Sequence, residues 1–300
     1  MNLPNSLRGL GDYWERSIAS QFPKRASNYQ APSSEECQML KDTVILARQG
    51  DLDQAQDLAT KLGCQLNTLQ LGGESFLLLE EQKERKGWGK VLFRENASSN
   101  LVIEVPHPVA DRNTPELGML AFDQLEADAY ILAGAHRANR AEPSPDVPGH
   151  TLSDMTHTKN TAFQAFHEGM LEPGTHVLQL HGFSAQKGHQ ADPEFPLSRE
   201  LVLSDGADDK HDPPLLKALG MEFSAAGFDA SVVSFDSQAN SRLGATTNVQ
   251  RDQMEDEQLV PTSEFLHLEV ETKLRKGPQR DENFRRIVEV LETAVKDDLR

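Results

Sequence analysis

The chain has 300 residues, and its 30 Lys and Arg against 47 Asp and Glu give a formal net charge of −17. So acidic a chain is poorly suited to binding nucleic acids or anionic membrane surfaces, because both carry dense negative charge. It has no run of about 18 apolar residues that would predict a transmembrane helix and no apolar signal segment near its start, so we expect a cytoplasmic protein.

The N-terminal part of the sequence is predicted to be helical. Ser33 and Glu36 have the spacing of a capping box, in which each side chain accepts the backbone N–H of the other residue. Asp51 can cap a second helix, which ends near Gly63. We therefore expect residues 1–66 to form a helical segment that packs on a main domain of residues 67–300.

From residue 64 onward, short apolar runs alternate with helical patterns. Strands are predicted at residues 76–80, 89–93, 101–105, 129–135, 176–180, 200–203, 230–235 and 264–270, and helices at 115–127, 162–171, 214–226 and 281–297. Alternating strands and helices are typical of an α/β fold with parallel strands. We therefore predict a mixed, mostly parallel sheet with helices on both faces.

The stretch LVIEVPHPVADRNTPELG, residues 101–118, carries the most chemical information. Pro106 has no N–H to donate and ends the strand, so His107 lies just past its carboxyl end. Asp111 follows in a loop, and the next residues predict a helix start with Thr114 as the N-cap. Ligands of open α/β sheets gather at the carboxyl ends of strands, which makes His107 and Asp111 a candidate half of a metal site.

Further reactive side chains lie on later strands. His181 ends one predicted strand, and His267 and Glu269 share a face of the last one. A zinc hydrolase needs three protein ligands, an open position for water and a general base beside that water. His107, Asp111 and His181 can supply the ligands and Glu269 the base, although a hydrogen-bonded structural role is commoner for any one such histidine.

Two assignments stay open within this set. Glu116 can replace Asp111 as the acidic ligand, although its place in the first turn of a helix already has a structural reason. Glu271 has the same parity as Glu269 and can replace it as the base, although it lies at the end of the strand, where we expect solvent.

Two other functions fit parts of the sequence. Residues 180–184, LHGFS, are similar to the oxyanion segment of serine α/β-hydrolases, but the chain lacks the G-x-S-x-G motif that carries their nucleophile. A non-catalytic binding module on the same fold is the second alternative, in which the acidic surface and the helical segment serve a protein partner. Such a module has no need of a base at Glu269, whereas hydrolysis does.

The motifs VPHP with its following acid and TPELG, AGAHR, D-x-x-H, LQLHGF and FLHLEVETKLR occur in this order from about Asn67 to the C-terminus. Together they resemble the zinc carboxypeptidase-like superfamily, in particular N-formylglutamate amidohydrolases and phage poly-γ-glutamate hydrolases. The resemblance implies zinc ligands at His107, Asp111 and His181 and a catalytic carboxylate at Glu269, with Arg275 beyond it. The acid stands one residue later than in the carboxypeptidase signature, whose position is Ala110 here.

The resemblance also implies hydrolysis of an amide bond, in an N-acyl amino acid or in a peptide of C-terminal or γ-glutamyl type. Members hold a substrate carboxylate with arginines, and Arg137 and Arg140 lie in the right region here. Arg242, in a predicted loop, is the next candidate. Arg137 directly follows a predicted strand, and its planar guanidinium can form two parallel hydrogen bonds to a carboxylate. We therefore predict a small-molecule or peptide substrate with a free carboxylate. An ion pair with Asp154 is the competing explanation for Arg137, and the oligomeric state stays open.

Overall fold

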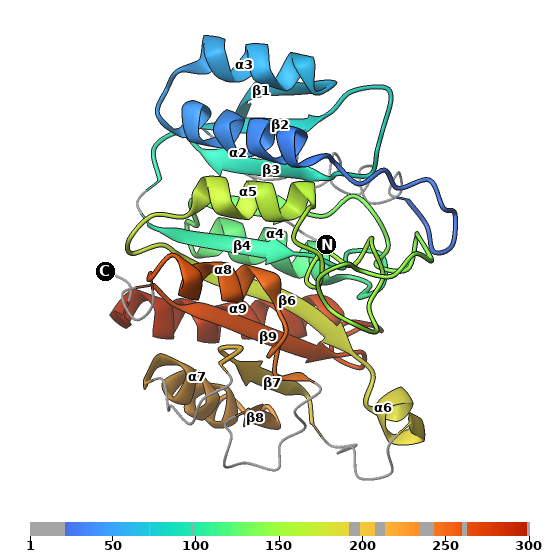
Figure 1. The fold of residues 1–300 in the computed structure, drawn as a ribbon. Coiled ribbons are helices and arrows are strands. Elements are labelled where there is room, and N and C mark those ends of the chain that lie inside the picture. The colour runs from blue at the N-terminus through green and yellow to red at the C-terminus, as the bar shows by residue number, and fades with distance from the viewer. Residues whose placement is uncertain are drawn as a thin grey trace.

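The computed structural model describes residues 22–71, 73–97, 99–191, 199–207, 214–233, 243–259 and 263–298, and Figure 1 shows their arrangement. The strands of this part are β1 (Cys64–Leu71), β2 (Glu74–Glu81), β3 (Lys90–Arg94), β4 (Leu101–Val105), β5 (Ala129–Leu132), β6 (His176–Phe183), β7 (Leu201–Ser204), β8 (Ala230–Val232) and β9 (Phe265–Glu271). Its helices are α2 (Ser34–Arg48), α3 (Leu52–Lys61), α4 (Thr114–Gln124), α5 (Ala162–Met170), α6 (Ala185–Ala191), α7 (Pro214–Ala225), α8 (Val249–Asp256) and α9 (Arg280–Asp298).

All the described strands belong to a single mixed sheet with the order β1-β2-β3-β5-β4-β6-β9-β7-β8. The centre, β5-β4-β6-β9, is parallel, whereas β1, β2 and β3 form an antiparallel meander and β7 runs antiparallel to β9. The predicted α/β class with a mixed sheet is confirmed. Because the central strands are parallel, the carboxyl ends of β4, β6 and β9 lie at the same edge of the sheet (Figure 1).

The helices cover both faces of the sheet, as predicted. One core cluster joins α4, α7 and α9 to the sheet, and a second cluster joins α2, α3, α5 and α8 to the other face. Side chains alternate along each strand, so Ile103 and Val105 of β4 enter the first core, whereas Val102 enters the second. Glu104 has the parity of Val102, and this carboxylate is therefore buried on the side that α5 covers.

The N-terminal helices form as the sequence predicts. Ser33 and Glu36 make the capping box of α2, and Asp51 caps α3 through the backbone N–H of Gln54. Helix α2 packs closely on α5, since a Cβ atom added to Gly169 would lie 2.7 Å from the Cβ atom of Val44. Strand β1 was not predicted from the sequence, and it places residues 64–66 in the sheet. The boundary between residues 66 and 67 stays a prediction.

Several local predictions need correction. Asn113, not Thr114, is the N-cap of α4; the Thr114 hydroxyl instead donates to the carbonyl of Asp111 at 2.7 Å. Helices α6 and α8 were not predicted, because both are short and α8 is largely polar. Strand β6 continues to Phe183, so His181 lies inside this strand. Within the described part of the chain, no helix is long and apolar enough to cross a lipid bilayer.

Candidate metal centre

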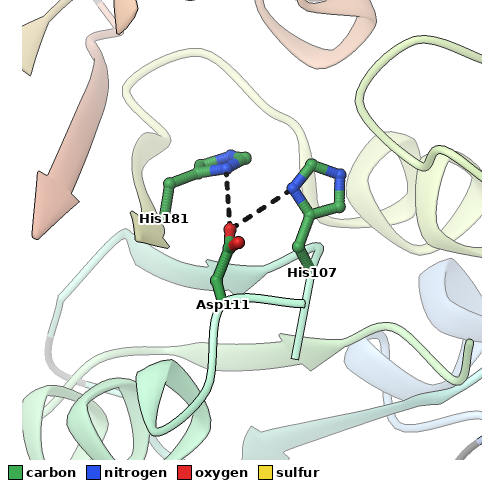
Figure 2. A group of neighbouring side chains, drawn as sticks. All are labelled: His107, Asp111 and His181. Carbon is green, nitrogen blue, oxygen red and sulfur yellow. Dashed lines mark ion pairs between the residues drawn. The ribbon is translucent and has the colours of Figure 1, made fainter. Parts of the chain in front are cut away.

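The three predicted ligands meet at the carboxyl edge of the central strands. His107 follows β4, Asp111 lies in the turn before α4, and His181 projects from β6 (Figure 2). The carboxylate Oδ2 of Asp111 lies 3.5 Å from Nδ1 of His107 and 3.6 Å from Nδ1 of His181. All three residues are at most 5% exposed, so water cannot satisfy their polar atoms from the surface.

The outer nitrogen of His107 fixes the protonation of its ring. His107 Nε2 lies 2.9 Å from Oδ1 of Asp154, and an ionised carboxylate can only accept, so Nε2 carries the hydrogen. In a neutral ring Nδ1 then holds a lone pair. This Nδ1 faces Asp111 and has no hydrogen-bond partner among the described residues.

His181 is held in the same way. Its Nε2 lies 2.9 Å from the side-chain oxygen Oε1 of Gln179, which is an acceptor, so this nitrogen also carries the hydrogen. Burial lowers the pKa of His181 to about 4, so the ring is neutral near pH 7. Its Nδ1 therefore presents a second lone pair to the carboxylate of Asp111.

Three acceptor atoms thus converge with no hydrogen between them, an arrangement that a cation stabilises. Two imidazole nitrogens and a carboxylate oxygen are ligands that zinc accepts in catalytic sites. Without a metal, a proton takes its place: burial disfavours charge on His107, but Asp154 and hydrogen bonds with Asp111 outweigh this and raise its pKa to about 9. Burial acts against ionisation of Asp111 too, yet its contacts with the two histidines and the positive charges of protonated His107 and of Arg137 hold its pKa well below the usual range.

Glu269 lies beside this group on β9, directly across from His181 in the register of β6 and β9. Its Oε2 atom and the Nδ1 atom of His267 are buried and have no hydrogen-bond partner among the described residues. Burial, with the negative charge of Asp111, raises the pKa of Glu269 to about 8. Suitable atoms of His181, His267 and Glu269 lie within 4.8 Å of one another, so His267 and Glu269 face the same space as the predicted ligands.

The two competing carboxylates occupy other places. Glu271 is buried, contrary to the solvent exposure expected for it, because its Oε1 accepts the backbone N–H of Ala185 at the start of α6 and its Oε2 that of Lys273. Glu116 lies in the first turn of α4 and outside the described groups of clustered ligands. The geometry therefore favours Asp111 over Glu116 and Glu269 over Glu271.

The predicted arginines differ in what they contact. The Arg137 side chain is exposed and has no hydrogen bond or ion pair among the described residues, and its positive charge lowers the pKa values of Asp111 and Glu269. Its backbone is anchored, since the Ser153 hydroxyl donates to its carbonyl at 2.9 Å. Arg140 is already bonded to Glu142 and to the carbonyl of Tyr29. Arg242 lies outside the described residues.

Arg275, which the resemblance placed beyond the catalytic carboxylate, is buried. Its guanidinium donates to the carbonyls of Val270, Arg112 and Phe183. The group would collide with a side chain at position 182, because a Cβ atom on Gly182 would lie 2.3 Å from its Cζ atom. Arg275 therefore joins β6, β9 and the turn that carries Asp111.

Sequence reasoning missed the partner of His107. Asp154 accepts hydrogen bonds from His107 and from Nδ1 of His150 at 3.2 Å, and its Oδ1 lies 3.1 Å from Nδ1 of His157. The rings of His150 and His157 stack at 3.4 Å between centroids and 17° between planes, so the two ring planes are nearly parallel. One hydrogen on each ring satisfies these contacts without a metal. We therefore infer that Asp154, held by His150 and His157, orients the ring of His107.

The D-x-x-H motif at Asp154 was visible in the sequence, but nothing there joined it to His107, which lies 47 residues earlier. Gln179 was missed as well, although its parity with His181 on one strand was a usable signal. A cavity of about 600 Å³, lined by residues such as Arg48, Asn100 and Asp128, lies near the amino end of β4, away from these side chains.

No family model and no curated protein sequence matches the chain. Among solved structures it is similar to N-formylglutamate amidohydrolase from Ralstonia eutropha JMP134, with 14% identity, a TM-score of 0.49, and coverage of 70% of this chain and 98% of the other. It is also similar to zinc-free YNDL, with 15% identity, a TM-score of 0.42 and coverage of 72% and 93%. A metallo-carboxypeptidase from Burkholderia cenocepacia gives 11% identity, a TM-score of 0.39 and coverage of 84% and 69%. The structural neighbours of this α/β chain thus include an amidohydrolase and a metallo-carboxypeptidase, at low identity.

Proposed function

We propose that the chain is a zinc-dependent hydrolase of an amide bond. One observation carries the proposal: Nδ1 of His107, Nδ1 of His181 and Oδ2 of Asp111 face one another as acceptors, while hydrogen bonds from Nε2 to Asp154 and Gln179 fix both rings. This donor set suits zinc and leaves a position for water.

His107, Asp111 and His181 would hold the metal, which when bound supplies a Lewis acid that acidifies a water molecule and polarises a carbonyl. Glu269 takes the proton of the attacking water and passes it to the leaving amine. A base is most effective when its pKa lies near the working pH, and a carboxyl with a pKa of about 8 is shifted in that direction. His267 is buried beside Glu269, and its Nδ1 atom has no hydrogen-bond partner among the described residues.

The substrate carries a free carboxylate close to the scissile amide, and Arg137 binds it. Support comes from the guanidinium of Arg137, which has no hydrogen bond or ion pair among the described residues, and from the hydrogen bond that anchors its backbone to Ser153. The chain is strongly acidic as a whole, so an anionic substrate needs such a local cation. N-acyl amino acids and short peptides with C-terminal or γ-glutamyl bonds fit this description.

The test combines metal analysis with turnover. We expect one zinc per chain after stripping with a chelator and titration with zinc, and loss of this zinc in His107→Ala and His181→Ala. Glu269→Gln should keep the zinc and lose about 10²- to 10⁴-fold in turnover of N-acyl amino acids or short peptides. A wild-type chain that takes up no stoichiometric zinc would overturn the proposal, and zinc binding without any turnover would instead support the binding module.

A further inference from the structure

We propose that Asn248, the N-cap of α8, determines which ring nitrogen of His181 carries the hydrogen and which is left as a lone pair for the metal, acting through the side-chain amide of Gln179. This inference rests on the proposed metal centre and adds positioning residues to it. Asn248 and Gln179 do not approach Asp111 themselves. They fix the hydrogen on the far side of the His181 ring, and the lone pair on the near side follows from it.

The first link is the helix cap. The side-chain oxygen Oδ1 of Asn248 accepts the backbone N–H groups of Gln250 at 3.0 Å and Arg251 at 3.2 Å. These two bonds settle which end of the Asn248 amide is oxygen. The Nδ2 group must then point the other way, and it donates to Oε1 of Gln179 at 2.6 Å.

The second link orients the amide of Gln179 from its other end. Its Nε2 group donates to Oε2 of Glu104 at 2.8 Å and has a longer contact of 3.3 Å with Oε1 of Gln250. Glu104 in turn is held at 2.7 Å by Nδ1 of His167. The carboxylate of Glu104 and the side-chain amide of Asn248 thus both require that Gln179 directs its side-chain oxygen, not its nitrogen, towards His181.

The third link is burial. Glu104 and Gln179 are fully buried, Asn248 is 2% exposed and His181 is 5% exposed. If the Gln179 amide were turned, its nitrogen would face the donor of Asn248 and its oxygen would face the carboxylate of Glu104. Burial keeps bulk solvent from relieving either repulsion. His181 Nε2, 2.9 Å from Gln179 Oε1, must therefore donate, and its Nδ1 is left as a lone pair for a metal.

Two substitutions at position 248 separate this role from helix capping. Asp and Ser both cap helices about as well as Asn, so Asn248→Asp and Asn248→Ser should keep α8. Asn248→Asp puts an acceptor where Nδ2 was and repels Oε1 of Gln179, which favours the turned amide. Asn248→Ser removes the donor without adding an opposing acceptor, so Glu104 still orients Gln179, and this variant is the matched control.

A double variant separates the role from general stability. In Glu104→Gln/Asn248→Asp the turned amide of Gln179 can donate to the carboxylate at position 248 and accept from the amide at position 104. Only the longer contact with Gln250 is lost. Folding stability should therefore recover relative to Asn248→Asp alone, while the reversed network keeps the wrong hydrogen on His181.

The measurements are the zinc dissociation constant, the melting temperature and the ¹⁵N chemical shifts of the His181 ring in the metal-free chain. We expect 10- to 100-fold weaker zinc binding in Asn248→Asp and in the double variant, with the hydrogen moved from Nε2 to Nδ1. Asn248→Ser should stay within about threefold of wild type in zinc affinity, since Glu104 keeps the amide in place. The added negative charge of Asn248→Asp would by itself strengthen cation binding, so weaker binding is the more telling result.

Zinc affinity that recovers together with stability in the double variant would overturn the inference, because a purely structural role predicts that result. An unchanged Nε2–H tautomer in both Asp-containing variants would overturn it too. If the wild-type chain binds no zinc, the proposed function fails by itself. The ring shifts of the metal-free wild type and variants then still decide whether Asn248 sets the tautomer.

Discussion

At the scale of single residues, the direction of each hydrogen bond at the candidate metal centre determines what the side chains can hold. A neutral histidine ring has one N–H group. His107 donates it to Asp154 and His181 donates it to Gln179, both on the outer side of the site. The inner nitrogens then face the carboxylate of Asp111, which is itself an acceptor. A metal or a proton must fill this position, and the two compete.

This competition predicts a pH dependence of metal binding. The pKa of His107 in the folded metal-free chain is raised to about 9, so its proton is present at pH 7 and must leave when zinc binds. Zinc affinity should therefore rise about tenfold per pH unit up to about pH 9 and then level off. The same proton stabilises the metal-free fold; this contribution is complete below the unfolded pKa of about 6.5 and is lost as the pH rises through 9.

Titration of the metal-free chain with zinc at several pH values measures this dependence. Asp154→Asn is the informative variant, because the Asp154 charge is the largest influence that raises the pKa of His107. Its affinity curve should level off at a lower pH than that of wild type. A zinc affinity independent of pH between 7 and 9 in the wild type would contradict the assignment.

Arg137 gives a kinetic prediction at the same scale. Arg137→Lys keeps the charge but loses the planar fork, so one charge-assisted hydrogen bond to a substrate carboxylate is lost. Such a bond contributes about 1.5–3 kcal/mol, and we expect kcat/KM to fall about 10- to 100-fold with zinc content unchanged. Comparing a substrate with its carboxamide analogue is the control. If the substitution costs the same on both, Arg137 does not recognise the carboxylate.

At the scale of elements, the packing of α2 on α5 ties the N-terminal helices to the sheet. Gly169 in α5 approaches α2 so closely that an added Cβ atom would lie 2.7 Å from Val44 Cβ and 3.0 Å from the carbonyl oxygen of Lys41. Both atoms belong to the rigid part of a helix, so neither can move away without shifting α2. The absence of a side chain at this position sets the distance between the two helices.

Gly169→Ala tests this contact, because two effects of opposite sign meet there. Alanine favours a helix over glycine by about 1 kcal/mol, but overpacking a helix interface costs about 1–3 kcal/mol. We expect the steric effect to win and the free energy of unfolding to fall by about 1 kcal/mol. Urea unfolding measures it, and a more stable variant would show that α2 can move away from α5.

At the scale of the whole molecule, the rate at which the two cysteine thiols react measures how often the folded chain unfolds. Cys64 is buried and Cys37 half-buried, and burial is the main cause that raises the pKa of each thiol to about 12. At pH 8 only about one thiol in 10⁴ is then a thiolate, against about one in four for a free cysteine. The native chain should therefore react with an aromatic disulfide reagent far more slowly than the urea-unfolded chain.

Zinc should slow this reaction further, since a ligand that binds only the folded state lowers the population of open molecules. The comparison of metal-free and zinc-loaded wild type measures the effect, and His181→Ala, which should not bind zinc, is the control. Rapid modification of both thiols in the native chain at pH 8 would show that the packing around them is looser than described.

The sequence by itself determined the order of most of the described elements, because apolar periodicity, prolines and capping residues are local properties. The strand before Pro106, the capping box at Ser33 and the mixed α/β class all follow from neighbours in the chain. It also identified His107, Asp111, His181 and Glu269 as candidate site residues. Strand ends and side-chain parity indicate which residues lie together at the carboxyl edge of a sheet. Helix α8 was not predicted, because a short polar helix lacks the apolar periodicity that identifies a helix in the sequence.

Only the tertiary structure decided which hydrogen bonds these side chains form and in which direction. Asp154 reaches His107 across 47 residues, and Asn248 reaches Gln179 across 69. Hydrogen-bond direction depends on which acceptor lies opposite each donor in space, and no local pattern contains that information. The same reason separates Glu269 from Glu271, which have the same parity on β9. The backbone N–H groups of Ala185 and Lys273 occupy the oxygens of Glu271, whereas Glu269 faces the proposed metal ligands.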